Sequence, residues 1–248
     1  MNPAEFANIA AAERSFWWYR GMREILFSLL DPIALEQPEA RVAEAGCGTG
    51  YLSRVLAERY RWTLFPLDIG AEGLAYARSY GVPRVVQGDA TALPFRENVF
   101  DLVLSIDVIA HLQRGREHPA LAEAYRTLCP GGRIVLRTSA FDVLRSCHSA
   151  FAGEEQRFTR QRLVAAVENA GFRVERVTYI NTVLLPVALF KFRVWEPLTR
   201  QRAASGVQPI APWLDRLLFA PLAWESRWIA KGRGFPAGQS LVLVGRKD

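Results

Sequence analysis

The feature that most constrains this chain is a glycine-rich segment, Val42–Gly50, with the sequence VAEAGCGTG. It follows a short apolar run, and a stretch with helical periodicity begins near Tyr51. Glycines at alternate positions allow a tight turn and bring backbone amides close to a ligand. A helix beginning there offers free N–H groups and its positive end to a carboxylate or phosphate. A purely structural strand-to-helix turn is the alternative interpretation.

Short β-branched runs alternate with helical stretches through the middle of the chain, a pattern typical of a parallel sheet with crossover helices. We therefore expect an α/β fold. The predicted strands are 41–45, 63–67, 84–87, 101–105, 133–137, 173–180 and 240–246. The predicted helices are 51–60, 72–80, 119–129 and 159–170, the last with Thr159 as N-cap and Gly171 at its C-terminal end.

Acidic residues follow two of the predicted strands. Asp68 comes about 20 residues after the glycines, where a carboxylate can accept hydrogen bonds from ribose hydroxyls. A helix N-cap is the other interpretation of Asp68. Asp89 lies in the segment Gln87–Ala90, at the end of the third strand.

Together these segments resemble the class I (Rossmann-like) S-adenosylmethionine (SAM)-dependent methyltransferases, and in particular their small-molecule and lipid group of the ubiquinone and menaquinone biosynthesis kind. The G-x-G-x-G spacing, with Glu44 two positions ahead of it, resembles motif I of that family. Phe100–Ser105 and Leu128–Arg133 resemble its FD-hydrophobic and LxPGG segments. The resemblance covers about residues 40–180 and 240–246.

The resemblance implies a seven-stranded sheet of order 3-2-1-4-5-7-6, with the last strand antiparallel, flanked by helices and with a helical lid inserted before the last strand. It also implies SAM as cofactor and S-adenosylhomocysteine (SAH) as product. No metal is expected. The residues expected to bind the cofactor are Tyr19, Arg20, Glu44, Gly46, Cys47, Gly48, Gly50, Asp68, Ile69, Asp89, Ala90, Ser105 and Ile106.

The segment after the fourth strand, Ser105–His111, bears on the acceptor. It lacks the Asn/Asp-Pro-Pro-Tyr/Phe sequence of amino-methylating nucleic-acid enzymes, which disfavours exocyclic amine targets. It resembles instead the small-molecule and lipid methyltransferases, which implies a small, apolar or lipid-like acceptor methylated on oxygen. His111 is the expected general base, because it follows the fourth strand and its unperturbed pKa of about 6.5 suits a base. The alternative is that His111 packs or caps the next helix. His148 is a second candidate, and His118 is expected to face solvent.

Two regions lie outside the alternating pattern, and they divide the chain into an expected cap, core and lid. Residues 1–38 form the predicted N-terminal helical cap, and 39–180 with 237–248 form the SAM-binding core. In the cap, Tyr19 or Arg20 would approach the methionine carboxylate of SAM. Alternatively, Trp17 and Trp18 simply pack against the sheet.

Residues 181–236 form the predicted lid, an insertion rich in basic residues and tryptophan. It contains eight Lys and Arg residues and three acids, so it carries 8 − 3 = +5 of the chain's formal net charge of +6. Within it, 212–231 has the spacing of an amphipathic helix, with Pro221 as a kink. The insertion would bury its apolar face on the core, roof a substrate pocket, or contact a membrane interface.

We therefore predict a SAM-dependent methyltransferase acting on a small-molecule acceptor. The alternatives are a non-catalytic SAM-binding regulator and, on basic charge alone, an RNA methyltransferase. DNA is not an expected partner, and RNA is disfavoured. Three scattered cysteines without a CxxC pair predict a cytoplasmic protein, with membrane association through 181–236 as an option.

Overall fold

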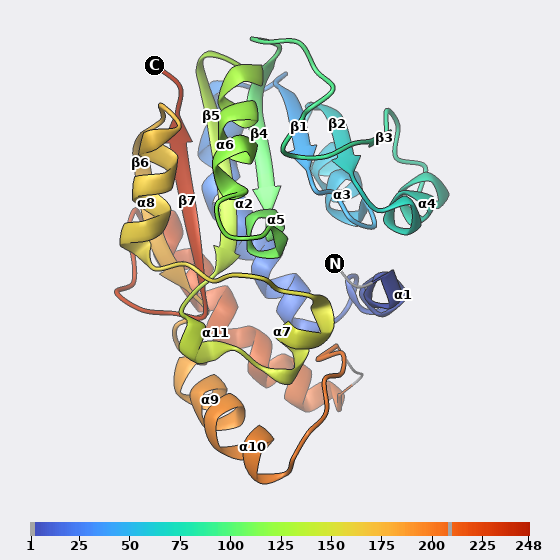
Figure 1. The fold of residues 1–248 in the computed structure, drawn as a ribbon, viewed down its shortest axis with the longest axis vertical. Helices are drawn as coiled ribbons and strands as arrows, with labels where there is room; N and C mark the ends of the chain where they lie inside the picture. The colour runs from blue at the N-terminus through green and yellow to red at the C-terminus, as the bar shows by residue number, and fades with distance from the viewer. Residues whose placement is uncertain (1–2, 208–209) are drawn as a thin grey trace.

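Seven strands form one mixed sheet in the order β3-β2-β1-β4-β5-β7-β6 (Figure 1). The computed structural model describes residues 3–207 and 210–248. The strands are β1 Arg41–Ala45, β2 Thr63–Asp68, β3 Val86–Gln87, β4 Phe100–Ile106, β5 Leu128–Ser139, β6 Arg173–Ile180 and β7 Ser240–Arg246. The pairs among β1 to β5 are parallel, and β7 runs antiparallel to both β5 and β6. The predicted fold class and strand order are confirmed.

Helices cover both faces of the sheet, which explains why strands such as β1 and β4 are buried almost throughout. On the face shown in Figure 1, α5 (Val108–His111), α6 (Glu117–Thr127) and α8 (Arg160–Asn169) pack around Leu121, Leu163 and Val167. On the opposite face, α2 (Trp17–Glu36), α3 (Tyr51–Arg59) and α11 (Pro212–Ala230) enclose a second core. The smaller α4 (Ala71–Ser79) lies beside β2 and β3.

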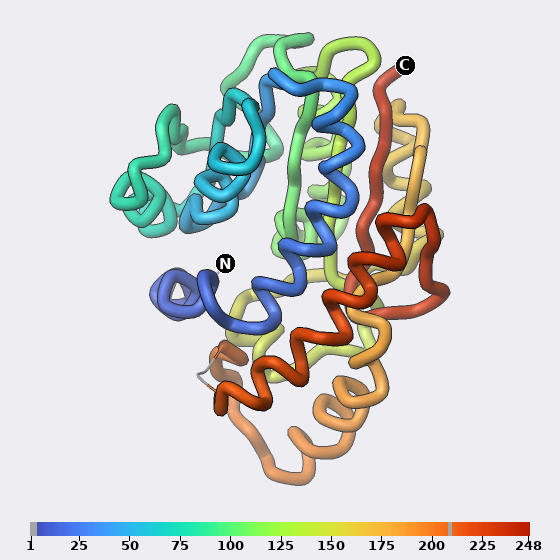
Figure 2. The backbone as a smooth tube through the Cα atoms, turned by 180° about the vertical axis from the view of Figure 1, so that it is seen from behind, coloured from blue at the N-terminus to red at the C-terminus, as the bar shows by residue number. Residues whose placement is uncertain are grey.

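The helices α2 and α11 cross the back of the sheet side by side (Figure 2). Their contact depends on a glycine, because a Cβ at Gly21 would lie only 2.3 Å from Cδ1 of Leu222. Leu222 and Ile229 of α11 are fully buried in the same core as the inner face of α2. The second half of α11 therefore packs on the core, and the helix continues through Pro221.

The remaining helices lie near the carboxyl ends of the parallel strands. They are α1 (Pro3–Ala12), α7 (Cys147–Ala152), α9 (Leu185–Phe190) and α10 (Glu196–Leu198). A π-helical turn, Lys191–Trp195, joins α9 to α10. Figure 1 places α9 and α10 at the lower end of the molecule, below the ends of β4 and β5. In the described part of the chain, no helix is long and apolar enough to cross a membrane.

The structure corrects several element boundaries. The strand expected at 84–87 is limited to Val86–Gln87, and the strand expected at 133–137 extends over Leu128–Ser139. The helix expected at 119–129 ends at Thr127, and Leu128 is extended and pairs with Phe100 as the first residue of β5. Pro130, which has no N–H to donate, explains why the helix stops before it. The predicted N-cap of α8 is confirmed, since the Thr159 side chain accepts a hydrogen bond from the backbone of Arg162.

Candidate active site

The strand order brings the ends of four neighbouring parallel strands, β3, β2, β1 and β4, to one edge of the sheet. Ligands of open α/β sheets bind at this carboxyl edge, where loops and helix N-termini meet. Glu44 stands near the end of β1, Asp68 at the end of β2, and Ser105 and Ile106 at the end of β4. Asp89 follows β3 after a single glycine.

The loop after β1 is held in an unusual backbone conformation. Gly46, Gly48 and Gly50 all have positive φ, at 85°, 55° and 73°, a region that favours glycine. A Cβ at Gly46 would lie 2.1 Å from Val108 of α5, whereas one at Gly48 would meet nothing closer than 3.9 Å. The helix α3 then begins after Gly50 without a side-chain cap. Its first amides therefore remain available to an anionic group.

Asp68 ties the loops after β1 and β2 together. Its Oδ2 accepts a hydrogen bond from the Gly48 N–H at 2.8 Å, and its Oδ1 accepts one from the Gly70 N–H at 2.7 Å. The N-cap of α4 is Gly70, which makes no side-chain cap bond. The carboxylate therefore supports the glycine-rich loop, as well as standing where a ribose would be recognised.

Glu44 is a buried carboxyl group whose side chain accepts a hydrogen bond from the Ser53 hydroxyl of α3. Burial, reinforced by the nearby carboxylates of Asp68 and Glu13, raises the pKa of Glu44 to about 7. The hydrogen bond from Ser53 opposes this shift only in part. Glu44 therefore titrates close to neutral pH.

The other predicted cofactor residues surround this carboxyl edge. Ile69, directly after Asp68, leaves 67% of its surface exposed, which is unusual for an isoleucine and suits an aromatic base. Asp89 accepts a hydrogen bond from the Thr91 N–H at 2.7 Å, and Ala90 beside it is half-buried. Cys47 and Ser105 are buried, and burial raises the pKa of the Cys47 thiol.

The N-terminal end of α2 places Tyr19 within electrostatic reach of Glu13 and Asp107 but directs Arg20 elsewhere. Burial, together with the carboxylates of Glu5 and Glu13, raises the pKa of Tyr19. Arg20 instead forms an ion pair with Asp215 of α11 at 2.5 Å and lies over the ring of Phe219 at 4.5 Å. Its guanidinium therefore joins α2 to the insertion.

Two charged residues at this edge were not expected from the sequence. Glu13, between α1 and α2, is buried and accepts hydrogen bonds from the hydroxyls of Thr49 (2.5 Å) and Tyr80 (3.0 Å). It thus connects the N-terminal segment to the glycine-rich loop. No motif surrounds Glu13, so the sequence contains no signal for this contact.

Arg137, at the end of β5, is the second residue that the sequence did not indicate. Its Nε lies 3.0 Å from Oδ1 of Asp107, and its guanidinium lies 4.7 Å from the ring centroid of Trp18. Asp107 has a φ of 61°, a conformation that non-glycine residues rarely adopt. This ion pair fixes the segment that leads from β4 into α5.

The two candidate bases, His111 and His148, differ in which ring nitrogen can accept a proton. Nδ1 of His111 lies 3.0 Å from the carbonyl oxygen of Gly153, which can only accept, so Nδ1 carries the proton and Nε2 keeps its lone pair. Nδ1 of His148 instead accepts from the Gly206 N–H at 2.9 Å, so its neutral ring carries the proton on Nε2. Burial also lowers the pKa of His148. His118 is exposed.

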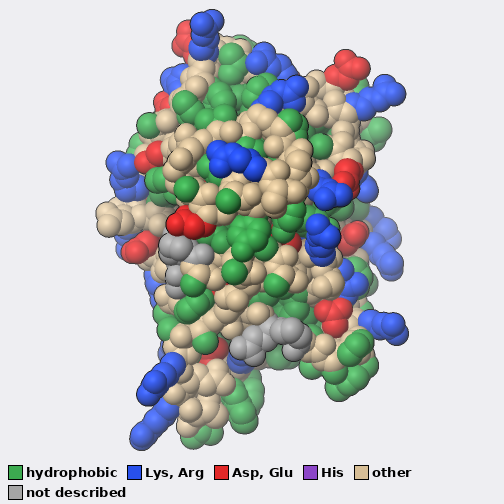
Figure 3. Space-filling view, turned by 90° about the vertical axis from the view of Figure 1, so that its right-hand side faces the viewer, with side chains coloured by type: hydrophobic (Ala, Val, Ile, Leu, Met, Phe, Trp, Pro, Cys, Tyr) green, Lys and Arg blue, Asp and Glu red, His purple; other side chains and the backbone are tan. Residues whose placement is uncertain are grey.

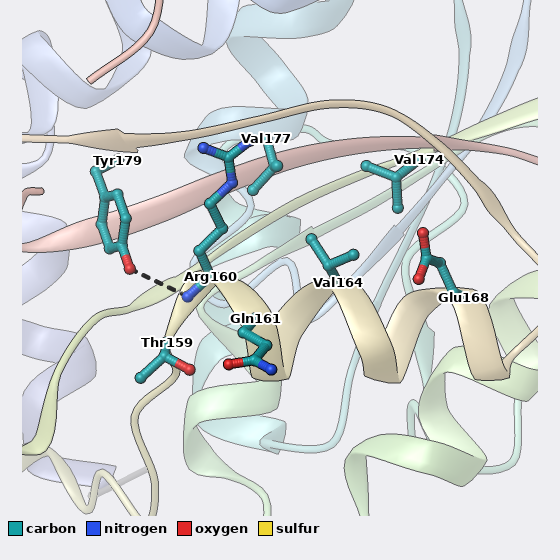
Figure 4. A pocket seen from close by; sticks show the side chains of 8 residues that line it. All are labelled: Thr159, Arg160, Gln161, Val164, Glu168, Val174, Val177 and Tyr179. Atoms are coloured by element: carbon teal, nitrogen blue, oxygen red, sulfur yellow. Dashed lines mark hydrogen bonds between the residues drawn. The ribbon is translucent and has the colours of Figure 1, made fainter. Parts of the chain in front are cut away.

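A shallow groove elsewhere on the surface does not belong to this site. It lies between α8 and β6, lined by Val164, Val174 and Val177 (Figure 4). At one end, Tyr179 accepts a hydrogen bond from the Arg160 N–H at 3.1 Å. Because β6 is the outermost strand on the side of the sheet away from β1 and β2, the groove is remote from the glycine-rich loop.

A sheet of this order, with a glycine-rich loop after its first strand and carboxylates after the next two, defines the class of SAM-dependent methyltransferases. The residues present fit SAM. A Cβ at Gly48 would meet only Phe6 of α1, at 3.9 Å, the first amides of α3 carry no side-chain cap, and Asp68 and the exposed Ile69 stand beside them.

Comparison with known proteins agrees with this class. Residues 43–136 match the family model described as a methyltransferase domain. The malonyl-[acyl-carrier protein] O-methyltransferase of Enterobacter lignolyticus is 28% identical over 214 residues, which cover 84% of this chain and 81% of the relative. Malonyl-[acyl-carrier protein] O-methyltransferase 1 of Coxiella burnetii is 35% identical over 112 residues, covering 45% of this chain and 38% of the relative.

A further relative, from Bos taurus and named as a tRNA methyltransferase 9B, is 33% identical over 108 residues, covering 43% of this chain and 23% of the relative. The matches to the Coxiella burnetii and Bos taurus proteins thus span less than half of those proteins' own length.

Solved structures show the same fold. A structure from Galdieria sulphuraria described as a methyltransferase has a TM-score of 0.60 at 18% identity, covering 92% of this chain and 86% of that one. Phosphoethanolamine N-methyltransferase 2 of Haemonchus contortus, solved with SAM, has a TM-score of 0.55 at 18% identity, covering 88% and 51%. The chain therefore contains a methyltransferase domain at residues 43–136 and shares the fold of SAM-dependent methyltransferases.

Proposed function

We propose that this chain methylates an oxygen atom of a small, apolar or lipid-like acceptor by in-line displacement, with His111 as general base. The observation that carries the proposal is the hydrogen bond from His111 to the Gly153 carbonyl, which leaves Nε2 as a proton acceptor. A hydroxyl acceptor must lose its proton as the new bond forms, and a positioned base assists that step.

One group of residues in the chain would bind the cofactor, and His111 would act as the base. The glycine-rich loop, Asp68 and Ile69 would hold SAM, which when bound supplies a methyl group on a positively charged sulfonium. Asp89, Ser105 and Ile106 would complete its binding site, with Tyr19 closing over it from α2. His111 stands at the C-terminal end of α5, directly after the turn that follows β4.

The backbone around His111 explains how its ring is held. The Glu155 and Gln156 N–H groups both donate to the carbonyl oxygen of Ala110, at 2.9 and 3.1 Å. The Gln156 side chain donates to the carbonyl of Ile109 at 3.0 Å. The segment 153–156 therefore holds α5 by hydrogen bonds, and its Gly153 carbonyl oxygen accepts the hydrogen bond from the His111 imidazole.

Contacts of the insertion support its proposed role as a lid over the acceptor, with residues 1–38 as a cap. The Gly206 N–H donates to His148 of α7, and the Ser205 hydroxyl donates to Glu5 of α1 at 2.9 Å. The segment 201–207 of the insertion thus contacts both α7 and α1. Peripheral membrane contact through 181–236, as a source of apolar acceptors, forms part of the same proposal.

The relatives support oxygen as the methylated atom, since the two bacterial relatives are named as O-methyltransferases. The test is transfer of labelled methyl from SAM to phenolic, aliphatic hydroxyl and carboxyl acceptors of increasing apolar size. For a hydroxyl acceptor, His111→Gln should lower kcat at least about 100-fold while SAM binding is retained. His118→Gln, at an exposed histidine, should behave like the wild type.

Full activity of His111→Gln would overturn the role of the base. Transfer to tRNA in place of every small acceptor would overturn the acceptor class and favour the RNA alternative. SAM binding without transfer to any acceptor would instead favour a non-catalytic regulator.

A further inference from the structure

The insertion 181–236 exposes an unusual amount of apolar surface. Of the twelve large hydrophobic side chains that are exposed in the described part of the chain, only Leu35, Ile69 and Val143 lie outside it. The nine within it are Val183, Val187, Phe190, Val194, Trp195, Leu198, Trp213, Leu217 and Trp224. Such a concentration on one segment marks an interaction surface, whereas scattered single residues would not.

Four of these residues share one face of a helical segment, and a fifth precedes it. Val187, Phe190, Val194 and Leu198 recur every three or four residues through α9, the π-helical turn and α10, and Val183 lies in the turn just before α9. We call them the insertion stripe. The opposite face is the buried one, since Ala188 and Glu196 are 7% and 6% exposed. The apolar side of this helix therefore points away from the protein.

The basic residues of the insertion lie on its outer surface, and its acidic residues face the rest of the protein. Its eight basic residues are all exposed: Lys191, Arg193, Arg200, Arg202, Arg216, Arg227, Lys231 and Arg233. Its three acids all turn inward. Glu196 accepts from the Cys147 N–H at 2.8 Å, Glu225 from the Thr182 and Val183 N–H groups at 2.7 and 2.8 Å, and Asp215 is paired with Arg20. The outer surface of the insertion thus carries positive charge alone.

This surface lies at the end of the molecule toward which the carboxyl ends of the parallel strands point. Figure 1 places α9 and α10 below the carboxyl ends of β4 and β5, and Figure 3 shows hydrophobic and basic side chains together at the same lower end. A partner bound here would therefore lie at the same end of the molecule as the carboxyl edge of the sheet.

We propose that the insertion stripe and its basic neighbours dock the protein onto an anionic lipid bilayer. Apolar side chains on the outer face of a short helix enter the boundary between head groups and acyl chains, while Lys and Arg extend their charges to lipid phosphates. An anionic bilayer satisfies both properties of the surface.

The same observations disfavour two other occupants. RNA would satisfy the positive charge but leave the four aliphatic residues of the stripe in water, since nucleic acids recruit aromatic side chains for stacking. A second copy of the chain would cover the stripe but bring two positive surfaces together, which is repulsive. The docking extends the membrane contact proposed above, and its test contains neither SAM nor acceptor, so its outcome is independent of methyl transfer.

The experiment is co-sedimentation of the purified chain with phosphatidylcholine vesicles that contain or lack phosphatidylglycerol. We expect binding to the anionic vesicles, weakened by salt, and little binding to the neutral ones. The combined variant Phe190→Ser, Val194→Ser and Leu198→Ser should bind at least about tenfold more weakly. So should Lys191→Glu with Arg193→Glu.

Matched controls use exposed residues outside the insertion. Leu35→Ser removes an apolar side chain that is 86% exposed at the C-terminal end of α2, and Arg61→Glu with Arg78→Glu makes the same change in charge. Both should bind as the wild type does. All replaced side chains are exposed, so far-ultraviolet circular dichroism should show wild-type folding.

Absence of binding to anionic vesicles would overturn the proposal. So would equal loss of binding in the control variants. If the wild type forms a stable dimer and does not bind vesicles, and the stripe variant is monomeric, the surface is instead a contact between two copies of the chain.

Discussion

The carboxylate of Asp68 accepts a hydrogen bond from the Gly48 N–H at 2.8 Å and joins the end of β2 to the glycine-rich loop after β1. Its second oxygen accepts from the Gly70 N–H at 2.7 Å. In Asp68→Asn, the amide nitrogen would face one of these two donors. An unsatisfied buried group costs about 1–3 kcal/mol, so we expect a lower Tm and a smaller stabilisation by SAH in thermal unfolding.

Asp101→Asn is the matched control for this variant. Asp101 also accepts a hydrogen bond from a backbone N–H, that of Arg41, but at the amino ends of the strands. Its replacement should leave the stabilisation by SAH unchanged. An equal loss in both variants would show that the Asp68 effect is merely structural.

Glu44 gives the stability of the protein a pH dependence of predictable sign. Burial raises the pKa of Glu44 from 4.5 to about 7 in the folded chain, so folding disfavours its ionised form. Its contribution to stability is therefore complete below pH 4.5 and is lost as the pH rises toward 7. Glu44→Gln should remove this dependence and gain at most about 3 kcal/mol over the wild type at pH 8.

Urea unfolding of both proteins at pH 5 and pH 8 measures this difference. Other titrating groups are shared by the two proteins, so they cancel in the comparison. A Glu44→Gln variant that loses more stability at pH 8 than at pH 5 would contradict the assignment.

Gly21 and Leu222 set the distance between α2 and α11. A Cβ at Gly21 would lie 2.3 Å from Leu222, so Gly21→Ala should cost about 1–3 kcal/mol despite the better helix propensity of alanine. Leu222→Ala should cost about 2–5 kcal/mol because the side chain is fully buried. The double variant should lose less than the sum, since the added methyl group occupies part of the vacated space. Additive losses in urea unfolding would refute the contact.

The strands and the glycine-rich loop could be predicted because their signals are local. The apolar runs place most strands within a few residues, and the spacing of Gly46, Gly48 and Gly50 specifies a turn that only glycine adopts easily. The sequence also assigned an acid to the end of β2, where Asp68 stands.

Contacts between distant segments could not be predicted in the same way. Arg20 and Asp215 are 195 residues apart, and nothing near Arg20 indicates that it turns toward the insertion. Glu13 meets Thr49 only because α1 folds back over the loop. The sequence pattern also did not tell which apolar face of the insertion is buried. The structure buries Leu222 of α11 and leaves Phe190 and Leu198 of α9 and α10 exposed.

Calorimetric titration of the folded chain tests directly whether the carboxyl edge around Gly48 and Asp68 is a SAM site. We expect saturable binding of SAM and of SAH at one site per chain. We expect no binding of NAD, whose phosphates are typically held by a loop of G-x-G-x-x-G spacing. Absence of binding by both SAM and SAH, or binding of NAD in their place, would contradict this assignment.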